Sequence, residues 1–208
     1  MVSVSNKVAQ YHKVMSKYVP ADYVSYVVDL LVKHPVQFRV AKPRKTKLGD
    51  FRAEREGLHR ITVNGDLNQY SFLITTIHEF AHLVTFNDYG PRVKPHGKEW
   101  QNVYSKMLYP VVEAGHLPDD ISKAIERSLL NVKASSCTDQ NLHRVLMKYD
   151  KPKEGLVTLE TLEKESVFEL NGKSYQKGNL RRTRYVCTNT TNQRKYLISA
   201  LAQVKKIT

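Results

Sequence analysis

The stretch that organises this chain is residues 68–91, which read NQYSFLITTIHEFAHLVTFNDYGP. Apolar side chains recur in it at steps of three and four residues, which predicts a long helix with one face in the core. These apolar residues are Leu73, Ile77, Phe80 and Val84. Asn68 can cap the amino-terminal end with its side-chain oxygen, and Gly90-Pro91 ends the periodic run. We therefore predict one helix across almost the whole segment.

Within this helix, residues 78–82 read His-Glu-Phe-Ala-His. Residues four apart share a helix face, so His78 and His82 would direct two imidazoles at one point, with Glu79 beside them. This spacing is typical of zinc hydrolases, in which the glutamate accepts a proton from water. With 8 His and 11 Glu among 208 residues, roughly 0.016 accidental matches are expected. The alternative is a buried helix whose histidines only form hydrogen bonds.

A zinc ion that keeps one position open for water needs a third protein ligand. Asp88 lies six residues after His82, but it reaches the site only if the helix ends early, and the intervening residues favour helix. His96 stands in the segment 95–100, PHGKEW, at the start of a second amphipathic stretch. We expect it in the first turn of that helix, four residues before Trp100 and facing the other histidines. His96 is therefore the preferred third ligand.

Together these motifs resemble the SprT-like metalloprotease family, which includes the Spartan-type proteases that degrade proteins crosslinked to DNA. The resemblance rests on HEFAH at 78–82 followed by HGKEW at 96–100. The segments 48–52 and 60–64 are similar to the strand pair that precedes the active-site helix in that family, and the likeness covers roughly residues 5–115. It implies one zinc ion, Glu79 as the catalytic glutamate, and three metal ligands, namely His78, His82 and His96.

The chain departs from many bacterial members of this family at its carboxy-terminal end. Those members finish with a four-cysteine zinc ribbon, whereas this sequence has two cysteines, Cys137 and Cys187. A structural zinc site needs four closely spaced ligands, so this pair cannot build a second one. We expect two free thiols, with Cys187 in a strand, and a single zinc ion as cofactor. Manganese or iron also suits three histidines.

The fold class that we predict is α+β. The chain is long enough, with 41% hydrophobic residues, for one domain with its own core and a small appended module. A polar segment at 149–155 marks the boundary, so the domains are 1–150 and 151–208. The first would be a zincin-like metalloprotease domain, with helices packed on a small antiparallel three-stranded sheet. Its further helices are expected over 4–33 with a break at Pro20, 119–131 and 139–149, and its strands over 36–41, 47–54 and 58–64.

The last sixty residues change to short, alternating, β-prone segments, which predict a small antiparallel β module in place of the zinc ribbon. Asn171-Gly172 is a strong hairpin signal. The other expected strands lie at 157–162, 167–170, 173–175, 182–188 and 195–199.

The net charge is +13, and residues 151–208 hold 12 Lys and Arg against 5 Glu. Such an excess favours a polyanionic partner, and we expect DNA, bound by phosphate neutralisation and by stacking of bases on tyrosine. The residues expected to contact it form two groups, Lys42, Arg44, Lys45 and Lys47 in the first domain, and Lys177, Arg181, Arg182, Arg184 and Tyr185 in the second. The alternative is that these are solvated faces of a basic protein.

The amino-terminal residues lack the apolar core of a secretion signal, and no apolar stretch approaches the ~20 residues of a membrane span. We therefore expect a cytoplasmic protein, in which association with the nucleoid is an option, and no membrane partner. Three functions stay open: a zinc endopeptidase that cleaves proteins bound or crosslinked to DNA, a nucleic-acid-binding protein with a structural zinc site, and a peptidase whose charge is irrelevant. Glu79 favours a peptidase, because a structural site needs no general base.

Overall fold

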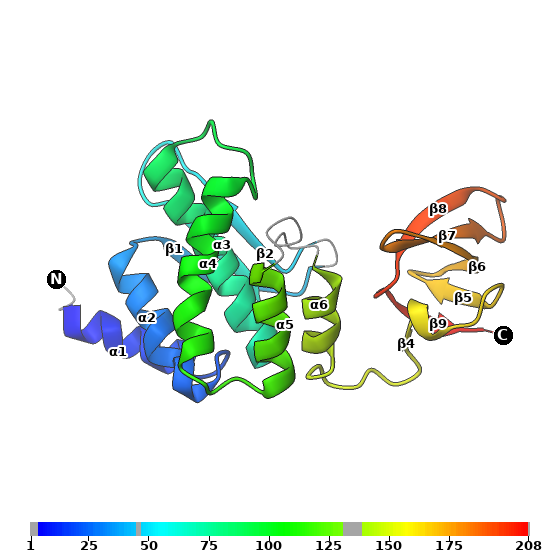
Figure 1. The fold of residues 1–208 in the computed structure, drawn as a ribbon, viewed down its shortest axis with the longest axis horizontal. Helices are drawn as coiled ribbons and strands as arrows, with labels where there is room; N and C mark the ends of the chain where they lie inside the picture. Colours follow the sequence, from blue (N-terminus) through cyan, green and yellow to red (C-terminus); the bar gives the residue numbers. More distant parts are fainter. Residues whose placement is uncertain (1–3, 45–46, 131–138, 208) are drawn as a thin grey trace. The chain divides into compact units, whose positions relative to one another are not determined.

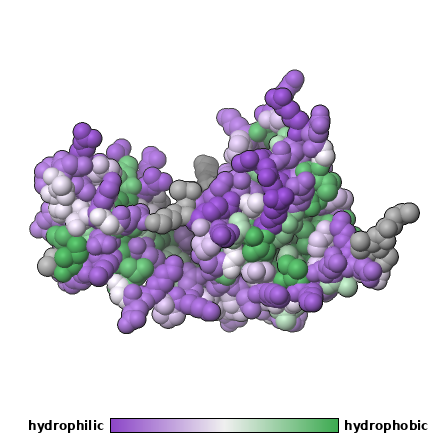
Figure 2. All heavy atoms as spheres, turned by 180° about the vertical axis from the view of Figure 1, so that it is seen from behind, coloured by the Kyte–Doolittle hydropathy of each residue, from purple (hydrophilic) through white to green (hydrophobic). Residues whose placement is uncertain are grey.

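The computed structural model describes residues 4–44, 47–130 and 139–207 (Figure 1). The chain divides into two compact units, Met1–Asp150 and Lys151–Thr208, and each has a hydrophobic core of its own. Lys45 and Cys137 lie outside the described residues. Hydrophilic side chains cover most of the face shown in Figure 2. Within the described ranges, no helix combines the length and apolar character that crossing a membrane requires.

The first unit contains six α-helices in its described part. They are α1 (Val4–Met15), α2 (Val24–Lys33), α3 (Gln69–Tyr89), α4 (Lys98–Glu113), α5 (Asp119–Leu130) and α6 (Gln140–Met147). The predicted break at Pro20 is confirmed, because a short 3-10 helix, Ala21–Tyr23, separates α1 from α2. Long-range hydrogen bonds fix α4, since the hydroxyls of Tyr23 and Tyr26 donate to main-chain oxygens of α4 at 2.9 and 2.6 Å.

The sheet of the first unit is mixed, so the predicted antiparallel sheet is wrong in this respect. Its strands are β1 (Gln37–Ala41), β2 (Gly49–Arg52) and β3 (Arg60–Asn64), in the order β1-β3-β2. The central strand β3 is parallel to β1 and antiparallel to β2. Alternation in the sequence shows where strands lie but not their order, and here the last strand is inserted between the first two.

Helix α3 is the structural centre of this unit, as the sequence predicts. It contacts α2, α4, α6, β2 and β3 (Figure 1). Phe72, Ile77 and Phe80 have no exposed surface, and Phe38 of β1 stacks on Phe80 with ring centroids 6.3 Å apart. The helix begins after its N-cap Asn68 and ends at Gly90, whose φ of 75° favours glycine.

Asn68 also joins α3 to the end of α6. Its side-chain oxygen accepts from the Ser71 amide at 2.9 Å, which is the expected cap. Its side-chain nitrogen donates to the Leu146 carbonyl oxygen at 3.0 Å and to an Asp150 carboxylate oxygen at 2.6 Å. One amide therefore starts the central helix and anchors the last helix of the unit.

The second unit is a six-stranded sheet in which every pair is antiparallel, as predicted. The order is β4-β9-β5-β6-β7-β8, and Asn171-Gly172 connects β5 to β6 with positive φ at both residues. The strands are β4 (Val157–Thr158), β5 (Val167–Leu170), β6 (Lys173–Arg181), β7 (Arg184–Asn189), β8 (Lys195–Ser199) and β9 (Gln203–Lys206). The predicted strand at 157–162 is wrong beyond Thr158, because Leu159–Thr161 turn as a 3-10 helix.

Replacing Asn68 by Asp separates its two roles. Asp keeps an oxygen for the Ser71 amide, but it loses the donor to Leu146 and places a carboxylate beside that of Asp150. We expect Asn68→Asp to lower the free energy of unfolding by about 1–3 kcal/mol, and Asn68→Ala to lower it because the cap, worth about 1 kcal/mol, and the donor to Leu146 are both lost. Urea denaturation measures both changes. Wild-type stability in Asn68→Asp would show that the contact with α6 contributes nothing.

Candidate metal centre

Three histidine side chains converge on one point of the first unit. His78 and His82 lie one turn apart on α3, and His96 lies in the loop that leads to α4. The Nε2 atoms are 3.1 Å apart for His78 and His82, 2.9 Å for His82 and His96, and 3.1 Å for His78 and His96. Among the described residues, these three form a group that can hold a metal ion.

The predicted position of His96 in the first turn of α4 is wrong. The helix begins at Lys98, and His96 precedes it with a φ of 60°, a left-handed conformation that is uncommon for histidine. The side chain of Gln101 donates to the His96 carbonyl oxygen at 3.0 Å, and the Gly97 amide donates to that of Lys94 at 2.8 Å. These bonds fix the loop so that the imidazole faces α3.

Asp88, the other candidate for a third ligand, is exposed in the last turn of α3. The helix runs without a break to Tyr89, so the carboxylate stays on the solvent side. It is not part of the histidine group.

The three nitrogens fit a divalent metal ion. In tetrahedral zinc sites with Zn–N bonds of about 2.0–2.1 Å, two ligand nitrogens are about 3.3 Å apart, slightly more than the distances seen here. Three imidazole nitrogens that all face one another cannot all be satisfied by mutual hydrogen bonds, whereas one cation satisfies all three lone pairs. Burial, with the neighbouring histidines, lowers the pKa of His78 to about 2 and that of His82 to about 4. Both rings are therefore neutral near pH 7, in the protonation state that binds metals.

Glu79 is buried beside this group, with 6% of its surface exposed. Burial first, and then the charge of Asp50, raise the pKa of Glu79 to about 8, while the Phe51 amide and two basic side chains oppose the shift. The backbone of β2 lies directly against the carboxyl group: a Cβ on Gly49 would be 2.7 Å from both Cγ of Glu79 and Cγ2 of Thr75. Glycine at this position leaves room for the glutamate side chain.

Aromatic rings enclose the histidines, a feature that the sequence interpretation missed. Trp100 is 1% exposed, and its ring centroid lies 4.6, 5.3 and 4.7 Å from those of His78, His82 and His96. Tyr104 stacks on Trp100, and Phe51 of β2 lies parallel to His82 at 6.5 Å. Helical spacing identifies Trp100 as a core residue, but only the fold shows that this core surrounds the imidazoles.

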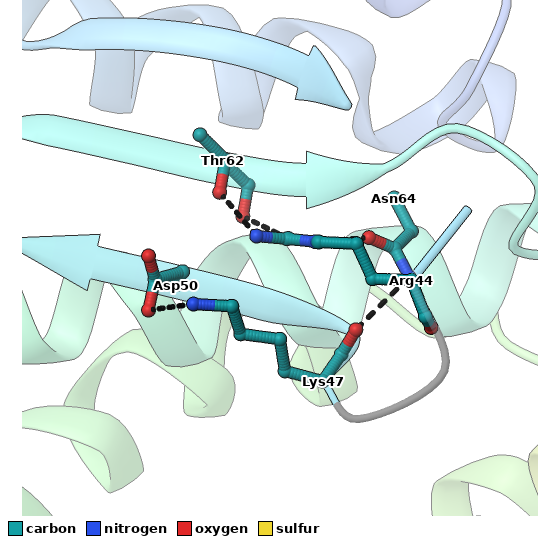
Figure 3. Close-up of polar contacts among 5 residues, drawn as sticks. All are labelled: Arg44, Lys47, Asp50, Thr62 and Asn64. Carbon is teal, nitrogen blue, oxygen red and sulfur yellow. Dashed lines mark hydrogen bonds and ion pairs between the residues drawn. The ribbon is translucent and has the colours of Figure 1, made fainter. Parts of the chain in front are cut away.

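The basic group of the first unit is largely engaged within the protein (Figure 3). The Arg44 guanidinium donates to the side-chain oxygens of Asn64 at 2.7 Å and Thr62 at 3.0 Å. Lys47 forms an ion pair with Asp50 at 2.7 Å. These hydrogen bonds of Arg44 hold the segment after β1 onto β3, and its contact with phosphate stays a prediction. Lys42 is exposed.

In the second unit, Lys177 is held inside the protein, and its contact with DNA stays a prediction. Lys177 is 4% exposed, and its Nζ donates to the carbonyl oxygens of Glu160, at 3.2 Å, and Leu162. It lies 4.0 Å from the centroid of the Tyr185 ring, so this ring face packs on the lysine and is not open to a base. Arg181, Arg182 and Arg184 are exposed around the β6–β7 turn. Cys187 is a buried free thiol in β7, as expected.

The zinc content of two variants distinguishes the candidate ligands. We expect His96→Ala to lower zinc affinity by at least about 100-fold, because two imidazoles remain where three converge. Asp88→Ala, the matched control, should bind zinc like the wild type. Dialysis against zinc buffers followed by atomic absorption gives both values. An equal loss of zinc affinity in the two variants, or no loss in His96→Ala, would contradict the assignment of His96 as the third ligand.

Comparison with known proteins places this site in a family. Residues 21–118 match the sequence profile of the SprT-like family. "Protein SprT" of Vibrio parahaemolyticus is 50% identical over 55 residues, which are 24% of this chain and 33% of the relative. "Protein SprT" of Pseudomonas aeruginosa is 51% identical over 35 residues, 16% of this chain and 21% of the relative. "Protein SprT" of Pasteurella multocida is 42% identical over 50 residues, which are 24% of this chain and 30% of the relative.

These alignments span about a fifth to a third of the length of the curated relatives. No solved structure matches the chain. The family match covers α2, the three strands, α3 and α4, and therefore contains all three histidines and Glu79. Residues 21–118, which hold the candidate metal centre, are thus similar to the SprT-like family.

Proposed function

We propose that the first unit is a zinc-dependent endopeptidase that acts on proteins bound or crosslinked to DNA. The observation that carries this proposal is the convergence of three neutral imidazoles within 3.1 Å, on the helix that also presents a buried carboxyl group. The match of residues 21–118 to the SprT-like family supports it, because the HEFAH and HGKEW motifs resemble the same family.

The residues divide the chemistry between them. His78, His82 and His96 would hold the ion, which when bound supplies Lewis acidity that polarises a carbonyl group and makes water more acidic. Glu79 would accept a proton from the attacking water and deliver it to the leaving amine. Burial raises the pKa of Glu79 to about 8, which keeps the carboxyl group mostly protonated at pH 7, and the positive charge of a bound ion would favour the carboxylate that accepts a proton. Trp100 and Phe51 would keep the imidazoles in place.

The buried glutamate favours catalysis over a structural role. A structural zinc site is normally closed by four protein ligands, whereas three histidines converge here among the described residues. Burying a carboxyl group costs free energy unless it is paired, and Glu79 requires a glycine in the facing strand as well. A site that serves only folding needs neither feature.

Glu79→Gln and Gly49→Ala test the catalytic role of the glutamate. We expect Glu79→Gln to keep its zinc and to lose at least about 100-fold of casein cleavage, because the proton acceptor is removed. Gly49→Ala should also keep zinc but displace the carboxyl group and lower the cleavage rate. In the Glu79→Gln background the Gly49 substitution should have no further effect on rate. Zinc-loaded wild type and Glu79→Gln with the same rate, or no cleavage by either with or without DNA, would favour a nucleic-acid-binding protein with a structural zinc site.

The DNA part of the proposal rests on the exposed arginines of the second unit. We expect single- or double-stranded DNA to stimulate cleavage, and the stimulation to fall steeply between 50 and 200 mM salt because phosphate contacts release counterions. Arg181→Glu/Arg184→Glu should abolish this stimulation without changing cleavage in the absence of DNA. Lys13→Glu/Lys17→Glu makes the same change in charge on exposed residues of the first unit and is the control. An equal effect of both pairs would mean that only net charge matters.

A further inference from the structure

A cavity of about 420 Å³ opens beside the metal centre in the first unit. Five residues of α3 line it, and they share one face of the helix: Ser71, Ile74, Thr75, His78 and Glu79. The cavity therefore follows α3 for about 12 Å, at 1.5 Å per residue, from the reactive end toward the helix N-terminus. A volume of this size lies within the range of ligand pockets, about 300–1,000 Å³.

The walls opposite α3 are mainly apolar. Leu48 precedes β2, Tyr104 comes from α4, and Leu142 and Leu146 come from α6. The last three are 6–7% exposed, while Leu48 is 42% exposed, so Leu48 lies at the rim. Apolar walls of this kind favour an apolar occupant, because its transfer from water contributes about 25 cal/mol per Å² buried.

Three polar side chains along the cavity, those of Ser71, Asp139 and Lys47, already have partners in the protein. The Ser71 hydroxyl accepts from the Asn68 side chain at 3.0 Å, and Asp139 caps α6 by accepting from two main-chain amides at 2.9 and 3.2 Å. Lys47 is paired with Asp50. A charged occupant would gain little from these groups and would lose its hydration.

We propose that this cavity binds the apolar side chain of the substrate residue that adjoins the scissile peptide bond. His78 and Glu79 belong both to the metal centre and to the cavity wall, so a peptide positioned for attack at the centre has a side chain within reach of the cavity. The preferred residues are Leu, Met and Phe. This proposal rests on the proposed peptidase function and adds a substrate preference to it.

Two probes of known chemistry test the proposal on the zinc-loaded full chain. They are tripeptide hydroxamates whose hydroxamate chelates zinc and whose adjoining residue carries either an isobutyl or a methyl side chain. We expect the isobutyl probe to bind at least about tenfold more tightly, as discrimination in apolar pockets usually gives. Calorimetry gives both dissociation constants, and equal affinities would overturn the proposal.

Leu48 and Leu58 provide matched variants. Leu58 is 45% exposed in the loop between β2 and β3, outside the cavity lining. Leu48→Asp and Leu48→Lys should each bring the ratio of the dissociation constants of the two probes close to one. Leu58→Asp should keep the wild-type ratio. The opposite charges of the two Leu48 variants separate loss of the apolar wall from electrostatic effects on zinc. An unchanged preference in the Leu48 variants would overturn the proposal. A Leu48 variant that changes the oligomeric state of the protein but keeps the isobutyl preference would also overturn the proposal. The cavity would then be a contact site for a second copy of the chain.

Cleavage mapping then separates this inference from the peptidase function. Casein fragments from the wild type should show Leu, Met or Phe enriched on one side of the cleaved bonds, and Leu48→Asp should lose that enrichment. Cleavage without any such enrichment would overturn the cavity proposal and leave the peptidase intact. Selective binding of the isobutyl probe by a chain that cleaves no protein would support the cavity and refute the peptidase.

Discussion

The structure depends on placing three neutral imidazoles and one carboxyl group inside the packed centre of the first unit. Burial opposes charge on all four groups, so it lowers the pKa values of the histidines and raises that of Glu79. Polar groups in such surroundings destabilise the fold unless something compensates them. A divalent cation at this group would do so, because it would satisfy three lone pairs together and its binding free energy would add to folding stability.

The elements around this group are arranged to hold it. Helix α3 carries two of the histidines and the glutamate, β2 faces the glutamate through Gly49, and the loop before α4 brings in His96. The stack of Trp100 on Tyr104 packs against the histidines from α4. Trp100 and Tyr104 also belong to the hydrophobic core, so the packing of the core supports the imidazoles from this side.

Much of this arrangement follows from the sequence, and the exceptions have physical causes. Helix α3, its cap at Asn68 and its end at Gly90 are local features, and local features can be predicted. The position of His96 beside the other two histidines could be predicted from the number of ligands that a metal requires. Its left-handed backbone conformation could not, because loop conformation depends on tertiary contacts. The order of the sheet depends on pairing between distant residues.

The basic residues show a second limit of sequence interpretation. Lys177 and Arg184 belong to the same cluster in the sequence, yet one is buried on main-chain oxygens and the other is exposed. Alternation along a strand assigns residues to two faces but does not say which face is covered. A bulge after Lys177 shifts the pairing of β6 with β7 further. The exposed residues of the proposed DNA surface are the three arginines of the second unit, and Lys42 and Lys47 in the described part of the first.

Zinc-edge anomalous diffraction from crystals of the full chain tests the metal centre most directly. We expect one peak at about 2.0–2.1 Å from the Nε2 atoms of His78, His82 and His96, with no fourth protein ligand. That result would describe an open site next to Glu79. A peak with four protein ligands would describe a closed structural site, and the absence of a peak among the histidines would remove the metal centre altogether.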